Sequence, residues 1–152
     1  MPIEIRKAVQ TDIDDLVKLL KLLFSIEADF DFDAGKQKRG LATLLQTPGA
    51  CVWVAMYEGH VVGMCTVQTL VSTAEGGCVG LVEDVVVEDA FRGRGVGKLL
   101  LSHMEAWCQQ QGMTRLQLLV DKNNHPALEF YKRQQWSSTD LICLRKKLLQ
   151  QT

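Results

Sequence analysis

The sequence lacks the features that mark secreted, zinc-binding and membrane-spanning proteins. Its five cysteines are odd in number and include no Cys-x-x-Cys pair, so neither a disulfide framework nor a metal site is predicted. The first residues, MPIEIRKAV, carry charges where a signal peptide has an apolar region, and no later apolar run reaches membrane-spanning length. We therefore expect a cytoplasmic protein that has no metal and no membrane partner.

Excess charge and internal repeats are also missing. The formal net charge of -1 gives no reason to expect nucleic acid as a partner. No low-complexity segment interrupts the 152 residues, and a hydrophobic share of 47% is enough to close one core. The prediction is a single domain over residues 1–152.

Hydrophobic periodicity predicts a mixed α/β (α+β) fold, with a mostly antiparallel sheet flanked by about four helices. The expected elements are a strand at residues 3–6, a helix that Thr11 caps, a helix from about Asp33 to Leu45, strands at Cys51–Tyr57, His60–Leu70 and Val79–Val87, a helix to about Gln111, a buried strand at Leu116–Val120, a helix from Pro126 to about Gln134 and a last strand at Leu141–Leu148. The three consecutive strands form an antiparallel meander, and a helical crossover of this length makes Val82–Val87 parallel to Leu116–Val120.

A glycine-rich turn follows the third strand of the meander, in the stretch VEDVVVEDAFRGRGVGKLLL at 82–101. A strand that leads through such a turn into a helix commonly holds an anion on the free N–H groups of the helix start. The P-loop pattern fails because Arg92 and Leu99 stand where glycine and a hydroxyl belong, and the dinucleotide pattern fails at Lys98. Neither ATP nor NAD is predicted, and a plain turn with solvated basic residues remains the alternative.

Two short motifs resemble the signatures of the GNAT superfamily of N-acetyltransferases. Arg92-x-x-Gly95-x-Gly97 is similar to its pyrophosphate loop, which reads Gln or Arg, two residues, Gly, one residue, Gly or Ala. NNHPALEFYKRQQW is similar to its second signature, except that Gln135 stands where the family usually has glycine, which puts the turn geometry there in doubt. The matching positions of this second motif are Asn124, Ala127, Phe130, Tyr131 and Trp136.

The resemblance covers essentially the whole chain and implies a GNAT fold, in which acetyl-CoA lies between two splayed, parallel, central strands. It implies an acyltransferase that moves an acetyl group directly to a primary amine in a ternary complex. A noncatalytic acyl-CoA-binding sensor on the same fold stays the alternative, and a homodimer stays open. The positions that the resemblance assigns to acetyl-CoA are Val85, Val86, Val87, Arg92, Gly93, Arg94, Gly95, Val96, Gly97, Lys98, Asn124, Ala127 and Tyr131.

The resemblance also implies the catalytic groups. Tyr131, with an ordinary pKa of about 10, would protonate the leaving thiolate, unless its ring only fills the core beside Phe130. Glu83 and Asp84 are the candidate bases, and in similar members of the family that have Glu-Asp here the Glu acts through water; the alternative is that one or both only pair with Lys or Arg at the sheet edge. Strand alternation puts Glu83 on the face of Val85 and Asp84 on the other face, unless a bulge re-aims one of them.

An acidic segment, EADFDFDAGK at 27–36, is the candidate acceptor site. Asp29, Phe30 and Asp31, together with Glu83, would attract a small cationic amine. The alternative is that Asp31 or Asp33 only caps the following helix. A polyamine, an aminoglycoside, an amino acid and a protein N-terminus or lysine all remain open as acceptors.

Overall fold

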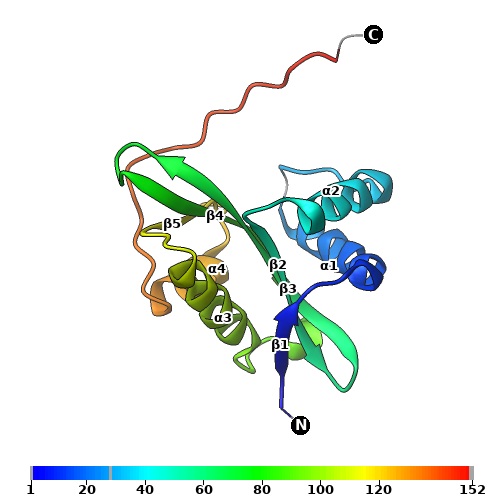
Figure 1. The fold of residues 1–152 in the computed structure, drawn as a ribbon. Helices are drawn as coiled ribbons and strands as arrows, with labels where there is room; N and C mark the ends of the chain where they lie inside the picture. The colour runs from blue at the N-terminus through cyan, green and yellow to red at the C-terminus, as the bar shows by residue number, and fades with distance from the viewer. Residues whose placement is uncertain (1, 28, 151–152) are drawn as a thin grey trace. The chain divides into compact units, whose positions relative to one another are not determined.

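A five-stranded mixed sheet forms the centre of the first of two compact units, which divide between Leu118 and Leu119. The computed structural model describes residues 2–27 and 29–150. The strands follow the chain order β1-β2-β3-β4-β5, antiparallel up to β4, with β4 and β5 parallel (Figure 1). This confirms the meander and the parallel pair. The bounds are β1 Glu4–Lys7, β2 Ala50–Tyr57, β3 His60–Ser72, β4 Gly77–Val87 and β5 Leu116–Leu118.

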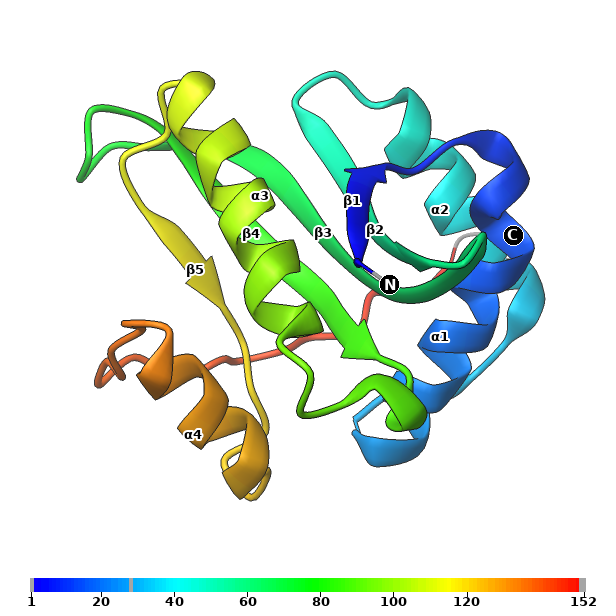
Figure 2. The ribbon, with the colours of Figure 1, turned by 90° about the horizontal axis from the view of Figure 1, so that it is seen from below.

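Helices cover both faces of this sheet. The helices α1 (Ile13–Ile26) and α2 (Ala34–Gln46) lie on one face, and α3 (Val96–Gln110) lies on the other (Figure 2). Short 3-10 turns, η1 (Gln10–Asp12) and η2 (Asp89–Phe91), precede α1 and follow β4. The second unit contains α4 (His125–Arg133). The four predicted helices are thus confirmed.

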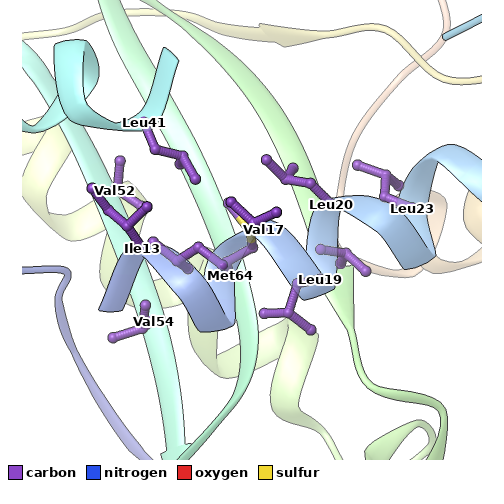
Figure 3. Packing of buried hydrophobic residues seen from close by; sticks show 11 residues of the cluster. Ile13, Val17, Leu19, Leu20, Leu23, Leu41, Val52, Val54 and Met64 are labelled. Carbon is purple, nitrogen blue, oxygen red and sulfur yellow. The ribbon is translucent and has the colours of Figure 1, made fainter. Parts of the chain in front are cut away.

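A hydrophobic stripe on α1 forms the core on its side of the sheet. Leucines at helical spacing place the stripe against the sheet, as their periodicity predicts. Each fully buried leucine contributes about 1.5–3 kcal/mol of transfer free energy, so this stripe anchors α1 firmly. The residues drawn in Figure 3, each at most 9% exposed, include Leu19, Leu20 and Leu23 of α1, Leu41 of α2, Val52 and Val54 of β2, and Met64 of β3.

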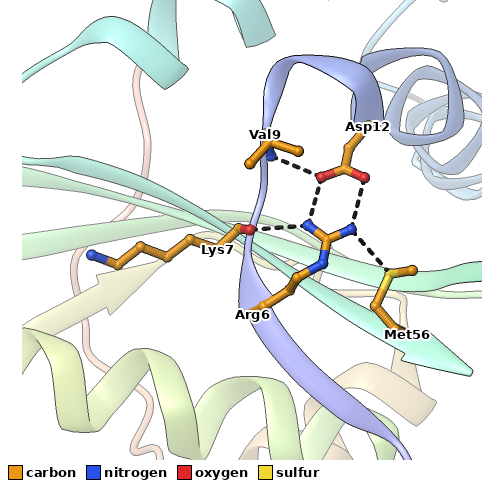
Figure 4. A network of polar contacts seen from close by, with 5 residues as sticks. All are labelled: Arg6, Lys7, Val9, Asp12 and Met56. Carbon is orange, nitrogen blue, oxygen red and sulfur yellow. Dashed lines mark hydrogen bonds and ion pairs between the residues drawn. The ribbon is translucent and has the colours of Figure 1, made fainter. Parts of the chain in front are cut away.

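The start of α1 is held differently from the prediction. Asp12, rather than Thr11, stands at the N-cap, and its carboxylate accepts hydrogen bonds from Arg6 at 2.8 and 3.0 Å and from the Val9 N–H at 2.8 Å (Figure 4). The Arg6 hydrogen bonds hold the pKa of Asp12 below its ordinary value. The cap prediction was wrong because Thr11 lies inside the 3-10 turn Gln10–Asp12, so that α1 begins only at Ile13, and Asp12 at the N-cap makes no side-chain cap hydrogen bond to α1.

The predicted last strand, Leu141–Leu148, does not form. Residues 141–150 carry no regular secondary structure, and the apolar side chains among them are 79–97% exposed. A strand forms only when its backbone hydrogen-bonds to a neighbouring strand. The apolar pattern of a segment does not by itself specify which strand that neighbour is. The parallel pair therefore ends the strand order instead of occupying its centre.

Candidate active site

A bulge interrupts β4 at the two acidic residues. Met64 pairs with Val86 and Thr66 pairs with Glu83, so Cys65 alone stands opposite two residues of β4. Asp84, one of these two, has a φ of +54°, in the left-handed region that non-glycine residues seldom adopt. Bulges of this kind re-aim side chains and are frequent beside active sites.

The bulge brings both acidic side chains to one face of the sheet. Thr66 and Glu83 are cross-strand partners and therefore share a face. The Thr66 Oγ1 also lies 3.4 Å from the Asp84 Oδ2, which places the Asp84 carboxylate on that same face. The face is the one that α1 covers, since Met64, two residues before Thr66, packs in the α1 core. Regular strand alternation, which places Glu83 and Asp84 on opposite faces, was thus wrong. The alternative, a bulge that re-aims one of them, was right.

The electrostatics of this bulge favour a proton acceptor at Asp84. The pKa of Asp84 is raised to about 6, mainly by burial; the Glu83 and Glu27 carboxylates also raise it, and the hydrogen bond from Thr66 lowers it. Glu83 itself is exposed, whereas Asp84 is partly buried. A carboxylate with a pKa near neutrality is well matched to general acid–base catalysis. Glu27, which ends α1, brings a third carboxylate to the site.

The edge of β4 is free of its parallel neighbour beyond the bulge. The ladder between β4 and β5 runs only from Gly80 to Val82. The Glu88 N–H bonds to the Val62 carbonyl of β3, so by alternation the backbone groups of Val87 point away from β3, where its carbonyl accepts from the Arg92 Nε at 3.3 Å. Outward backbone groups suit hydrogen bonding to an extended ligand, whereas the Val86 side chain is 4% exposed and lies in the core.

The glycine loop leaves its backbone open. Gly93 and Gly95 have φ values of +75° and +80°, and a Cβ added at either would meet no atom within 4 Å. Helix α3 begins at Val96, and the Leu99 N–H is bonded to the Gly95 carbonyl at 3.1 Å. The N–H groups of the first helical turn have no intrahelical acceptor and sit at the positive end of the helix dipole, which suits an anion.

The basic side chains of the loop are largely engaged with the protein. Arg92 forms an ion pair with Asp89 at 2.9 Å and donates through Nε to the Val87 carbonyl at 3.3 Å. The Arg94 guanidinium lies 5.2 Å from the centroid of the Phe91 ring. Lys98 is exposed. Backbone N–H groups, rather than the Arg92 charge, are therefore the better candidates to hold a diphosphate.

The second unit carries the other signature on α4. Asn124 caps the helix, since its Oδ1 accepts from the Ala127 N–H at 3.2 Å. The Tyr131 ring packs edge-on against Phe130 at 5.2 Å and Trp136 at 5.9 Å between centroids. Gln135 has a φ of +74°, so the residue that replaces the expected glycine takes the conformation a glycine would take. The turn geometry that the substitution put in doubt is preserved.

One part of the acidic segment caps a helix, and the other part is exposed. The Asp33 Oδ1 accepts from the Lys36 N–H at 3.2 Å, so Asp33, not Asp31, caps α2. Phe30 packs against Phe24, with 5.5 Å between ring centroids, and is 41% exposed. Asp29 and Asp31 are exposed.

Two further classes of site find no support among the residues that the structure describes. No helix there combines the length and apolar character that a membrane crossing requires. No group of three or more His, Cys, Asp or Glu side chains in 2–27 and 29–150 is placed to hold a metal ion.

Residues 15–135 match the model of the acetyltransferase (GNAT) family. The chain belongs to this family. Its members transfer an acetyl group from acetyl-CoA, and the chain is accordingly an acyltransferase. The chain is 27% identical over 135 residues to the aminoalkylphosphonate N-acetyltransferase of Salmonella typhimurium, covering 88% of this chain and 85% of that one.

Solved structures show the same fold. A Clostridium acetobutylicum protein described as a predicted acetyltransferase, solved with acetyl-CoA, aligns with a TM-score of 0.79 at 18% identity, over 95% of this chain and 96% of that one. An aminoglycoside acetyltransferase from a soil metagenome, solved with sisomicin, aligns with a TM-score of 0.77 at 20% identity, over 97% of both chains. At these identities the likeness establishes the fold alone.

Thr66 is the residue at this site that the sequence did not indicate. It lies in β3 among buried apolar neighbours and is 1% exposed. Threonine, like valine, is enriched in strands, so nothing in the pattern separates it from an ordinary core residue.

Proposed function

We propose that this acetyltransferase acetylates a small cationic primary amine by direct attack on acetyl-CoA in a ternary complex. The supporting observation is the β4 bulge, which gathers Glu83 and Asp84 on one face, within the field of Glu27. Three carboxylates around one position favour an ammonium group there.

The donor would bind along β4 and the glycine loop. The backbone groups of Val85 and Val87 would form hydrogen bonds with the pantetheine arm of acetyl-CoA. The N–H groups of Gly93 to Lys98 would hold its diphosphate. In the proposal Asn124, Ala127 and Tyr131 also act on acetyl-CoA, and residues 1–152 act as one domain. The open space beside Gly93 and Gly95 supports this arrangement.

Protons would move at two positions of the chain. Asp84, through a water molecule, takes a proton from the bound ammonium and leaves a neutral amine. The amine nitrogen then forms a bond to the acetyl carbonyl carbon, the carbon–sulfur bond breaks, and the nitrogen gives up its second proton to water as the amide forms. The Tyr131 hydroxyl donates its proton to the departing thiolate, since a thiol has an ordinary pKa of about 8.5 and holds the proton well at neutral pH. Glu83 and Glu27 would orient the cation.

Acceptor preference follows from the same charges. Exposed Asp29 and Asp31, with Phe30 beside them, extend the acidic surface of the α1–α2 segment. A second positive charge on the acceptor should therefore increase affinity, as in polyamines and aminoglycosides. An aminoalkylphosphonate, the acceptor in the name of the Salmonella relative, carries a negative group that these carboxylates would repel.

Release of free thiol from acetyl-CoA tests the proposal. Polyamines, aminoglycosides, amino acids, aminoalkylphosphonates and peptides with free N-termini or lysines are compared at equal concentration. We expect the highest kcat/KM for di- and polycations, and intersecting initial-rate patterns. Parallel patterns with an isolable acetyl-enzyme would reject direct transfer. Tight CoA binding without turnover on any amine would instead support an acyl-CoA-binding sensor.

A further inference from the structure

A buried hydroxyl lies directly beside the β4 bulge. Thr66 and Asp12 are the two buried polar or charged residues in the described part of the chain, and Asp12 belongs to the Arg6 network. Valine has nearly the same shape as threonine and would fill this position without a polar group. A buried hydroxyl is unfavourable unless it is hydrogen-bonded, so its partners indicate what it does.

The Thr66 hydroxyl has two acceptors, both on the bulge. Its Oγ1 donates to the Glu83 carbonyl at 3.1 Å and lies 3.4 Å from the Asp84 Oδ2. These contacts tie β3 to the two residues at which the ladder slips and the backbone of Asp84 turns left-handed. Thr66 therefore contacts both the backbone of the bulge and the carboxylate that the bulge presents.

We propose that Thr66 is a positioning residue that orients the Asp84 carboxylate and supports both of its protonation states. This rests on the proposed function, in which Asp84 receives the proton of the acceptor amine. A hydroxyl has one proton and can also accept. When Asp84 is ionised, the Thr66 O–H turns toward the carboxylate. When Asp84 is protonated, its O–H donates to the Thr66 Oγ1 while Thr66 donates to the Glu83 carbonyl.

Thr66 also opposes the groups that disfavour ionisation of Asp84. The titratable groups that act on or respond to Asp84 are Glu83 beside it on β4, Glu27 at the end of α1, and the Cys65 thiol opposite on β3. Burial raises the pKa of Asp84 most, both glutamates raise it as well, and the Thr66 hydrogen bond lowers it. Without this hydroxyl, Asp84 would hold its proton to higher pH and be a poorer acceptor at neutral pH.

The test compares Thr66→Val, which removes the hydroxyl at constant shape, with Thr66→Ser, which keeps it. The Asp84 carboxyl is titrated by carbon-13 NMR, with its resonance assigned by its loss in Asp84→Asn. We expect the Asp84 midpoint to rise in Thr66→Val and to stay near the wild-type value in Thr66→Ser. The acid limb of kcat/KM should move with it, lowering the rate about threefold to tenfold near pH 6 and little at pH 8, because the ionised fraction falls up to tenfold per pH unit of displacement.

A structural role alone would give a different result. An Asp84 midpoint that is unchanged in folded Thr66→Val, or a rate loss equal at all pH values, would overturn the proposal. If Thr66→Val does not fold, the wild-type protein is used instead. Its Thr66 side-chain resonances should shift with the same midpoint as the Asp84 carboxyl. Thr66 resonances that do not follow that midpoint would contradict the proposal. Absence of turnover on every amine would reject the proposed function, while the NMR titration tests the Thr66–Asp84 pair independently.

Discussion

Gly95 and Gly112 lie at opposite ends of α3 and share one backbone conformation, with φ values of +80° and +82°. A Cβ at either would meet no atom within 4 Å. The two positions differ in what they adjoin, because Gly95 precedes the first turn of the helix and Gly112 follows the last. They form a matched pair for separating backbone strain from ligand binding.

Gly95→Ala should weaken CoA binding, whereas Gly112→Ala should not. Each variant should lose about 1–2 kcal/mol of stability, since an L-residue is strained in the left-handed region. Only the Gly95 side chain would project where the diphosphate is proposed to bind. The measurements are CoA affinity by calorimetry and stability by urea unfolding. Equal affinities in the two folded variants would exclude the glycine loop as the diphosphate site.

Asp84→Asn should stabilise the protein at neutral pH. Asparagine tolerates the left-handed conformation and has no charge to desolvate. The pKa of Asp84 is raised to about 6 in the folded state. Ionisation therefore costs folding free energy above pH 6, and this cost disappears as the pH falls toward 4. We expect a gain of about 1–2 kcal/mol in unfolding free energy at pH 8 and almost none at pH 4. A variant that is less stable than wild type at pH 8 would show that ionising the buried Asp84 carboxyl does not cost folding free energy.

Asp12→Asn should destabilise the fold by about 2 kcal/mol, because it leaves the Arg6 guanidinium without its charged partner. Asp15→Asn is the matched control, since Asp15 forms an exposed ion pair with Lys18 at 3.8 Å and should change stability by less than about 0.5 kcal/mol. The pKa of Asp12 is lowered on folding, so its contribution is present above about pH 4 and is lost as the pH falls below that. Similar unfolding free energies for the two variants would contradict the assignment.

Much of the fold, but less of the site, follows from the sequence. The α1 stripe and the meander were predictable because burial imposes helical and alternating periods on the residues that it selects. The bulge was only an alternative, since Glu83 and Asp84 read as a regular strand until the pairing with β3 is known. Thr66 gave no signal, and the strand predicted at Leu141–Leu148 does not form, because pairing partners are set by the whole fold.

Gln135→Gly should raise the stability of the second unit. Gln135 holds a φ of +74°, which glycine adopts without strain. Relief of about 1 kcal/mol is partly offset by the greater freedom of glycine in the unfolded chain. Glu58→Gly, at a φ of +47° in the turn between β2 and β3, is the comparison in the first unit. Increased amide exchange in α4 of the Gln135 variant would show that the side chain makes contacts worth more than the strain.

Tyr131→Phe should lower kcat roughly a hundredfold if the hydroxyl protonates the leaving thiolate. The ring contacts with Phe130 and Trp136 should survive, so stability should change little. Acetyl-CoA affinity, measured separately, should also remain close to wild type. Full kcat in the variant, under conditions where chemistry limits the rate, would leave Tyr131 as a packing residue.

The pH dependence of kcat/KM for the amine, in wild type and in Asp84→Asn, tests most directly whether the β4 carboxylate takes the acceptor's proton. Wild type should show an acid limb near pH 6, in accord with the pKa of Asp84 raised by burial to about 6. Asp84→Asn should lose that limb and fall roughly a hundredfold in rate at neutral pH, with acetyl-CoA affinity unchanged. Glu83→Gln should keep the limb and move it to lower pH, since it removes a repelling charge. An acid limb that persists unaltered in Asp84→Asn would contradict the account.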